Sequence, residues 1–150
     1  MENIFNANVA DKITARIDQL TPDSKPLWGK MSVSKMLAHC NVTYELVYTD
    51  KHPKPNGLMK FVLKLLVKSK VVNEDPYKQN GPTAPAFIIK DDMNFDAEKT
   101  RLIDHINQTQ QHGRAFFDNK ESHSFGPLAA DEWNNMFYKH LDHHLRQFGV

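Results

Sequence analysis

Apolar residues recur every three or four positions along most of the chain, which is the spacing of one face of an α-helix. Long helices are predicted at residues 4–20, 32–48, 96–117 and 131–148, with Ser32 as the N-cap of the second. Little of the chain shows the strict alternation that a half-buried strand would give. Four long helices therefore dominate the predicted structure.

A shorter helix is predicted at 58–70, where Lys60, Lys64 and Lys68 form one polar edge and nearly all the rest is apolar. Such a helix suits a membrane surface, a position packed over the other helices, or a dimer interface with its lysines extended to solvent. Packing is favoured because the sequence carries no second lipid-directed signal. Since one packed face leaves a second apolar face to cover, we expect a homodimer. The alternative is that the loop at 71–95 folds back and covers this face within one chain.

The connection at 71–95 is rich in proline and is predicted to be a loop, with 87–89 extended. A loop of this length inside a compact domain is often found near a functional site. The predicted fold class is all-α. We expect a four-helix bundle with an extra short helix and a long connection between its second and third helices, in a single domain over 1–150.

The composition of the chain argues against several classes of function. A formal net charge of +1 gives no basic footprint for nucleic acid. The single cysteine, Cys40, excludes an internal disulfide and fits a reducing compartment. The sequence shows no signal peptide and no apolar stretch of about 20 residues, so we expect a cytoplasmic protein with no membrane span.

The strongest chemical signal is a pair of histidines near the C-terminus. His140 and His144 are four apart on a predicted helix and share a narrow inward stripe with Trp133 and Phe137. Two buried imidazoles need partners for their nitrogens, and a divalent transition metal satisfies both at once. The alternative is a chance pairing in a chain with eight histidines. His143 lies off this stripe and is predicted at its rim.

A catalytic zinc-type site commonly has a third protein ligand. The candidates are His39, His52, His105, His112, His123, carboxylates and Cys40. His39 is favoured because it shares an inward stripe of the second helix with Met36, Thr43 and Leu46. The alternative for His39 is a core histidine that hydrogen-bonds to a neighbour.

Three segments resemble those of DinB-like proteins. Residues 28–39 (WGKMSVSKMLAH) resemble the W-x-x-M-x-x-x-x-M-L-x-H segment of that superfamily, and residues 140–147 (HLDHHLRQ) resemble its closing H-x-x-H-H-x-x-Q. Residues 123–133 resemble the H-P-x-F-G-x-(L/M)-T-x-x-E-W link of one branch. The chain departs from that branch at Ser124 and at Ala129 and Ala130, which remove a side-chain N-cap from the last helix.

The resemblance implies a four-helix bundle in an up-down-down-up arrangement, with a metal held by His39, His140 and His144. It also points to dimers and to thiol transferases that use mycothiol, bacillithiol or glutathione. The leading hypothesis is therefore a metal-dependent S-transferase acting on a small-molecule substrate. The expected cofactors are a divalent transition metal, zinc or nickel in a purified sample, and a low-molecular-weight thiol.

Four further residues are predicted to line the pocket or to support the ligands: Gln147, Trp133, His143 and His123. For Gln147 the alternative is ordinary packing at a helix end. Two other functions stay open at this stage. One is metal-assisted hydrolysis, for which no clearly placed general base is evident. The other is a stress-related module that binds a metal or small molecule without turnover.

Overall fold

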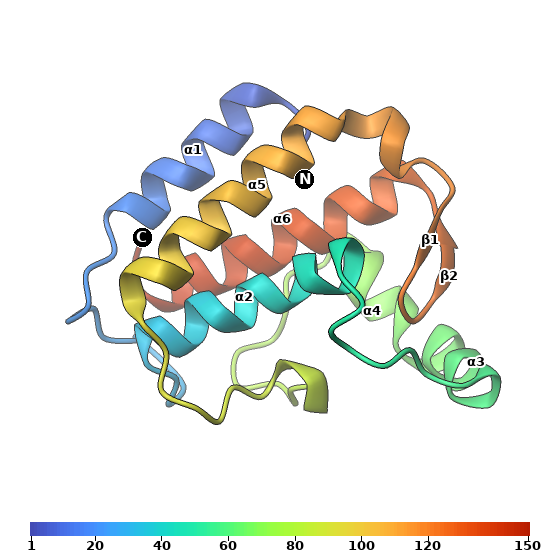
Figure 1. The fold of residues 1–150 in the computed structure, drawn as a ribbon, viewed down its shortest axis with the longest axis horizontal. Helices are drawn as coiled ribbons and strands as arrows, with labels where there is room; N and C mark the ends of the chain where they lie inside the picture. The colour runs from blue at the N-terminus through green and yellow to red at the C-terminus, as the bar shows by residue number, and fades with distance from the viewer.

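The computed structural model describes residues 1–150, and the chain is mostly helical (Figure 1). Its elements in order are α1 (Ala7–Asp18), α2 (Val33–Tyr48), α3 (Gly57–Leu66), α4 (Lys68–Val72), a 3₁₀ turn η1 (Pro85–Phe87), α5 (Phe95–Phe117), β1 (Lys120–Ser122), β2 (Gly126–Leu128) and α6 (Ala130–Gln147). The four long helices fall where the apolar periodicity predicts them.

The long helices enclose one hydrophobic core. Helix α5 packs against α1 and α2, and α6 packs against α1, α2 and α5. Aromatic rings fill the centre: the Phe137 ring stacks on Tyr44 and on Trp133, and Phe117 meets both α6 rings at a steep angle. Rings of this size bury a large apolar area, so this cluster anchors α6 against α2 and α5.

Three predicted boundaries differ from the structure. The first helix is shorter than 4–20, although Ile4 and Leu20 are still buried beside its ends. Apolar spacing marks which residues are inside the protein, and it does not show where the backbone stops being helical. The predicted helix at 58–70 is broken at Val67 into α3 and α4, and the predicted extended segment at 87–89 begins within η1.

The link before α6 forms a small antiparallel hairpin that periodicity cannot reveal, because each strand has three residues. The hairpin also brings Asp118 to the start of α6. The Asp118 carboxylate accepts a hydrogen bond from the backbone N–H of Ala130 at 3.1 Å, and Glu132 accepts one from Ala129 at 2.9 Å. The cap that Ala129 cannot provide is thus supplied by a residue twelve positions before Ala130.

The first prediction concerns the hydrogen bond by which Asp118 caps α6. Asp118→Ala leaves an N–H of the first turn of α6 without its acceptor and should lower the free energy of unfolding by about 1 kcal/mol. Urea denaturation followed by circular dichroism measures the change. Asp23→Ala, at an exposed loop position, is the control and should change stability little. Equal losses in the two variants would contradict the capping role.

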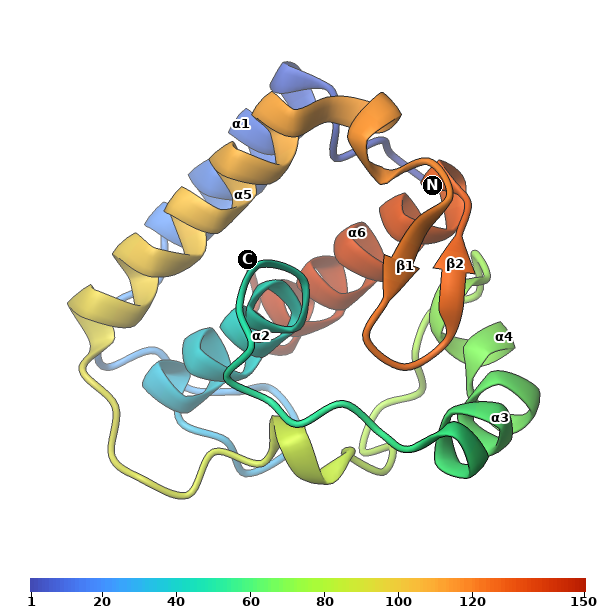
Figure 2. The same cartoon turned by 45° about the vertical axis from the view of Figure 1, so that its right-hand side comes forward.

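Helices α3 and α4 lie at one end of the molecule (Figures 1 and 2). Helix α4 is tied to α6 by Lys139, whose buried amine donates to the carbonyl oxygens of Lys70 and Asn73 and to the Asn73 side chain. Burial lowers the pKa of this amine to about 8. Helix α3 has no buried residue and contacts the core only through the half-buried Leu63. None of the helices combines the length and the hydropathy that a membrane-spanning helix requires.

Candidate functional site: three converging histidines

Three histidines from two helices converge between α2 and α6. His39 projects from the middle of α2, and His140 and His144 project from successive turns of α6. Their candidate ligand nitrogens all lie within 4.8 Å of one another. The Nε2 atoms of His39 and His140 are 2.9 Å apart. These are the three residues that the sequence predicts as ligands.

The outer nitrogen of each ring is held by a hydrogen bond. His39 Nδ1 donates to the backbone carbonyl of Phe87 at 2.9 Å, and His144 Nδ1 donates to Gln147 Oε1 at 2.8 Å. The Gln147 amide orientation is fixed because its Nε2 donates to the carbonyl of Trp28 at 2.8 Å. Since both acceptors are oxygens without a proton, Nδ1 carries the hydrogen in His39 and His144. Their Nε2 lone pairs are therefore free to bind a metal.

The third ring has a partner that suits either tautomer. His140 Nδ1 lies 3.0 Å from the hydroxyl of Thr43, which can donate or accept. Without a metal, His140 Nε2 must donate to His39 Nε2, because the His39 atom has only a lone pair. Metal ligation requires His140 to move its proton to Nδ1, where Thr43 would accept the hydrogen bond. Thr43 thus supports both states of the ring.

Burial keeps these rings uncharged. Removal from water lowers the pKa of His39, lowers that of His144 to about 3, and lowers that of His140 well below 6.5. The neighbouring imidazoles depress the pKa of His140 further, because two cations would repel each other at this distance. All three rings are therefore neutral at pH 7, as metal ligands must be.

The geometry fits a transition metal. Two nitrogens bound to one tetrahedral zinc, each at about 2.0–2.1 Å from it, lie about 3.3 Å apart. The 2.9 Å between His39 and His140 is close to that value, and all three ligand nitrogens lie within 4.8 Å of one another. A set of three neutral imidazoles suits zinc, copper, nickel or iron and disfavours magnesium and calcium, which prefer oxygen ligands.

Aromatic side chains surround the three histidines. Phe87 lies 5.3 Å from the His39 ring and 5.7 Å from His140, measured between ring centroids. Tyr77 meets both His140 and His143 edge-on. Trp28 meets His143 in the same way, and all these rings are partly exposed. We call Trp28, Tyr77 and Phe87 the aromatic mouth of the site.

The other residues predicted to line the pocket or support the ligands do not all lie at the site. Gln147 orients His144, and His143 lies at the rim. Trp133 does not line the pocket: it is 1% exposed and packs between Phe117 and Phe137 in the core. Its position on the same helical stripe as His140 reflects core packing two turns away. His123 lies in the β1–β2 turn, where Nε2 contacts the carbonyl oxygen of His52, and it does not reach the three histidines.

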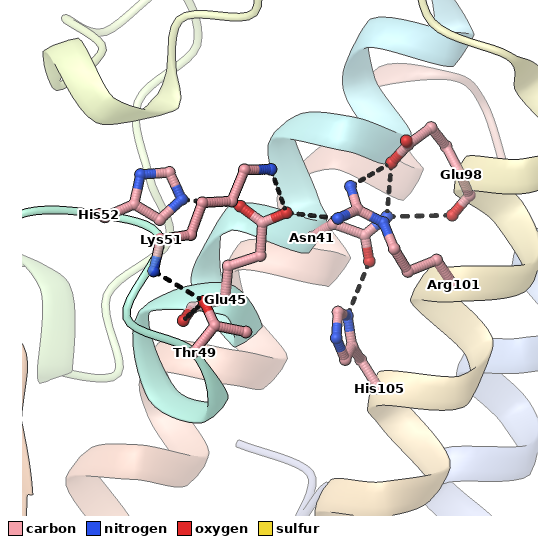
Figure 3. Close-up of polar contacts among 8 residues, drawn as sticks. All are labelled: Asn41, Glu45, Thr49, Lys51, His52, Glu98, Arg101 and His105. Atoms are coloured by element: carbon pink, nitrogen blue, oxygen red, sulfur yellow. Dashed lines mark hydrogen bonds and ion pairs between the residues drawn. The ribbon is translucent and has the colours of Figure 1, made fainter.

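A second polar cluster lies on the neighbouring face of α2 (Figure 3). The Glu45 carboxylate accepts hydrogen bonds from Lys51 at 2.9 Å, from His52 at 2.7 Å and from Arg101. Burial opposes ionisation of Glu45, but these three donors outweigh it and hold the pKa of the carboxyl at about 2. Arg101 also pairs with Glu98, so one guanidinium of α5 binds a carboxylate of α2 and a carboxylate of its own helix. A glutamate in a largely apolar helix was the available sequence signal, but its partner Arg101 lies 56 residues further along the chain.

A cavity of about 280 Å³ opens beside this cluster. It is lined by Ala38, Val42, Glu45, Lys51, His52, Ala86, Ile88, Ile89, Lys90, Asp91, Met93 and Arg101. Ala38 precedes His39, and Ala86 precedes Phe87. The cavity and the three histidines therefore share the η1 segment as a common wall. The prediction that the long connection lies near the candidate site agrees with this arrangement.

A further prediction concerns Gln147. Gln147→Leu removes the acceptor that holds His144 in its ligating tautomer, so affinity for zinc should fall about 10- to 100-fold. Competition with a fluorescent chelator measures the affinity. Gln110→Leu is the matched control, because Gln110 makes only a long, 3.5 Å hydrogen bond to Phe5 far from the histidines. Unchanged affinity in Gln147→Leu would refute the orienting role.

A family described as "Protein of unknown function (DUF1569)" has a model that matches residues 5–149. The match covers nearly the whole chain, so the chain belongs to this family. No curated protein and no solved structure matches the chain.

Proposed function

For this member of the family, we propose a divalent-metal-dependent enzyme of DinB-like type that transfers a small thiol to an electrophile. The observation that carries the proposal is the convergence of three neutral imidazoles whose outer nitrogens are already hydrogen-bonded. An arrangement of three protein ligands is typical of catalytic metal sites, because it leaves a coordination position for a reactant. The DinB-like part of the proposal rests on the motif resemblance.

The proposal includes the four-helix bundle in up-down-down-up order. It is supported by the contacts of α5 with α1 and α2 and of α6 with the other three long helices. It is also supported by the position of the three histidines on facing helices, as in metal sites built inside bundles.

The chain's own residues would act as follows. His39, His140 and His144 would hold the metal, and Gln147 and the Phe87 carbonyl would keep two of the rings oriented. A bound divalent metal would lower the pKa of a thiol, which supplies the thiolate nucleophile at neutral pH. The aromatic mouth would exclude water, and the adjacent cavity of about 280 Å³ has mixed apolar and charged walls that suit a small electrophile.

Monochlorobimane with glutathione, bacillithiol or mycothiol tests the proposal. In the reaction, the thiol sulfur bonds to the electrophilic carbon, chloride leaves with the bonding electron pair, and the thiol proton passes to the buffer. We expect zinc- or nickel-loaded protein to accelerate conjugation with at least one thiol, and chelation to remove the acceleration. Turnover of an ester without thiol would favour a hydrolase instead. Metal binding with no turnover of either substrate would favour a binding module.

A further inference from the structure

Helix α3 presents an apolar face to solvent. Its exposed apolar residues are Leu58, Met59, Phe61, Val62, Leu65 and Leu66. They make up most of the ten-residue helix, and none of its residues is buried. Contiguous apolar patches of this kind are uncommon on a free protein surface and mark an interaction site.

The apolar face points away from the rest of the protein. Lys60 pairs with Glu121 of β1, and Leu63 packs against the core, so these two residues define the inner side of α3. At about 100° per residue, Leu58, Val62 and Leu65 fall on the opposite side of the helix. Figure 2 shows α3 at the periphery, with α4 and the hairpin between it and α6.

Charge is concentrated around the same helix. Residues 51–73 contain six lysines and no aspartate or glutamate, whereas the remaining residues together carry a formal charge of −5. Four of these lysines pair with acids outside the segment, and Lys64 and Lys70 make no ion pair. An apolar helical face flanked by lysines is the pattern of helices that lie in a membrane interface.

We propose that α3 docks this protein peripherally on a bilayer surface that contains anionic lipid, with Leu58, Val62 and Leu65 inserted among the headgroups. A ten-residue helix is about 15 Å long and cannot span the bilayer, but it can lie in its interface. Twofold pairing through this face would bring two lysine-rich segments of like charge together, which disfavours a second copy of the chain as the partner. A fluid bilayer needs no shape complementarity. The proposal is independent of the metal site.

Vesicle flotation tests this directly. The purified full chain is mixed with vesicles of phosphatidylcholine alone, or with one third phosphatidylglycerol. We expect clear co-flotation with the anionic vesicles and several-fold less with the neutral ones. Leu65→Glu should reduce binding to anionic vesicles at least tenfold, because a charge replaces an inserted side chain. Leu27→Glu is the matched control: Leu27 is 70% exposed, close to the 62% of Leu65, and lies outside α3.

We expect Leu27→Glu to bind the anionic vesicles as well as the unmodified protein does. An equal loss in both variants would overturn the proposal, since binding would then follow net charge rather than α3. Absence of co-flotation of the unmodified protein would also overturn it. If sedimentation equilibrium then shows a dimer that Leu65→Glu dissociates, α3 is an interface between two copies, as the sequence predicts.

Discussion

His140→Ala should abolish stoichiometric metal retention while the protein stays folded. The substitution removes one of three converging nitrogens and also the 2.9 Å contact with His39. Loss of a residue that only supports a ligand typically costs 10- to 100-fold in affinity, so loss of a ligand itself should cost more than about 100-fold. Helicity should persist, because the core of Tyr44, Phe117 and Phe137 is untouched.

Plasma emission measures the metal content of His140→Ala after gel filtration, and circular dichroism measures its helicity. His143→Ala is the matched control: it removes a neighbouring imidazole of the same motif that lies at the rim, and it should keep the metal. Stoichiometric metal in His140→Ala would contradict the assignment. Complete loss of helicity would instead make these histidines structural.

Glu45→Gln should lower the free energy of unfolding by roughly 3 kcal/mol at pH 7. The Glu45 carboxyl titrates at about 2 in the folded protein and near 4.5 when unperturbed, and each unit is worth about 1.4 kcal/mol. Because the folded-state pKa is the lower one, the stabilisation is present in full above pH 4.5 and is lost as the pH falls towards 2. The difference between the two proteins should shrink to about half near pH 3.

Urea denaturation of both proteins at the two pH values measures this effect. Asp50→Asn is the control, because the Asp50 side chain is 97% exposed and its pair with Lys54 is long, at 4.0 Å. An exposed pair of this kind is worth well under about 1 kcal/mol. A loss in Glu45→Gln no larger than that of the control, or one that does not depend on pH, would contradict the role of Glu45 as a buried ionic link between α2 and α5.

The long helices and the inward histidines were predictable because both depend on local spacing. An apolar stripe with a period of 3.6 residues fixes which side of α2 and α6 faces inward, and His39 and His144 share that side. The same reasoning misplaced Trp133, because a stripe identifies a buried face without showing how far along the helix a site extends. The helix at 58–70 was predicted to pack on the protein, but its α3 part has no buried residue. Periodicity identifies an apolar face without showing what covers it.

The supporting residues were harder to predict because their contacts join distant segments. The Phe87 carbonyl reaches His39 from a loop 48 residues away, and Arg101 reaches Glu45 across 56 residues. A backbone carbonyl has no side-chain signature in the sequence. Thr43 was predicted to face inward, but its hydrogen bond to His140 joins α2 to a residue of α6 that lies 97 positions further along the chain. Such contacts follow from tertiary packing and leave no local pattern.

The most direct test of the central proposal is anomalous diffraction at the zinc edge from crystals of the zinc-loaded protein. We predict one strong anomalous peak between α2 and α6, within about 2.0–2.3 Å of nitrogens of His39, His140 and His144. The Gln147 and Phe87 hydrogen bonds to the outer nitrogens should be retained. A peak at other residues would contradict the proposal, and so would saturated zinc elsewhere with His39 and His140 still hydrogen-bonded to each other.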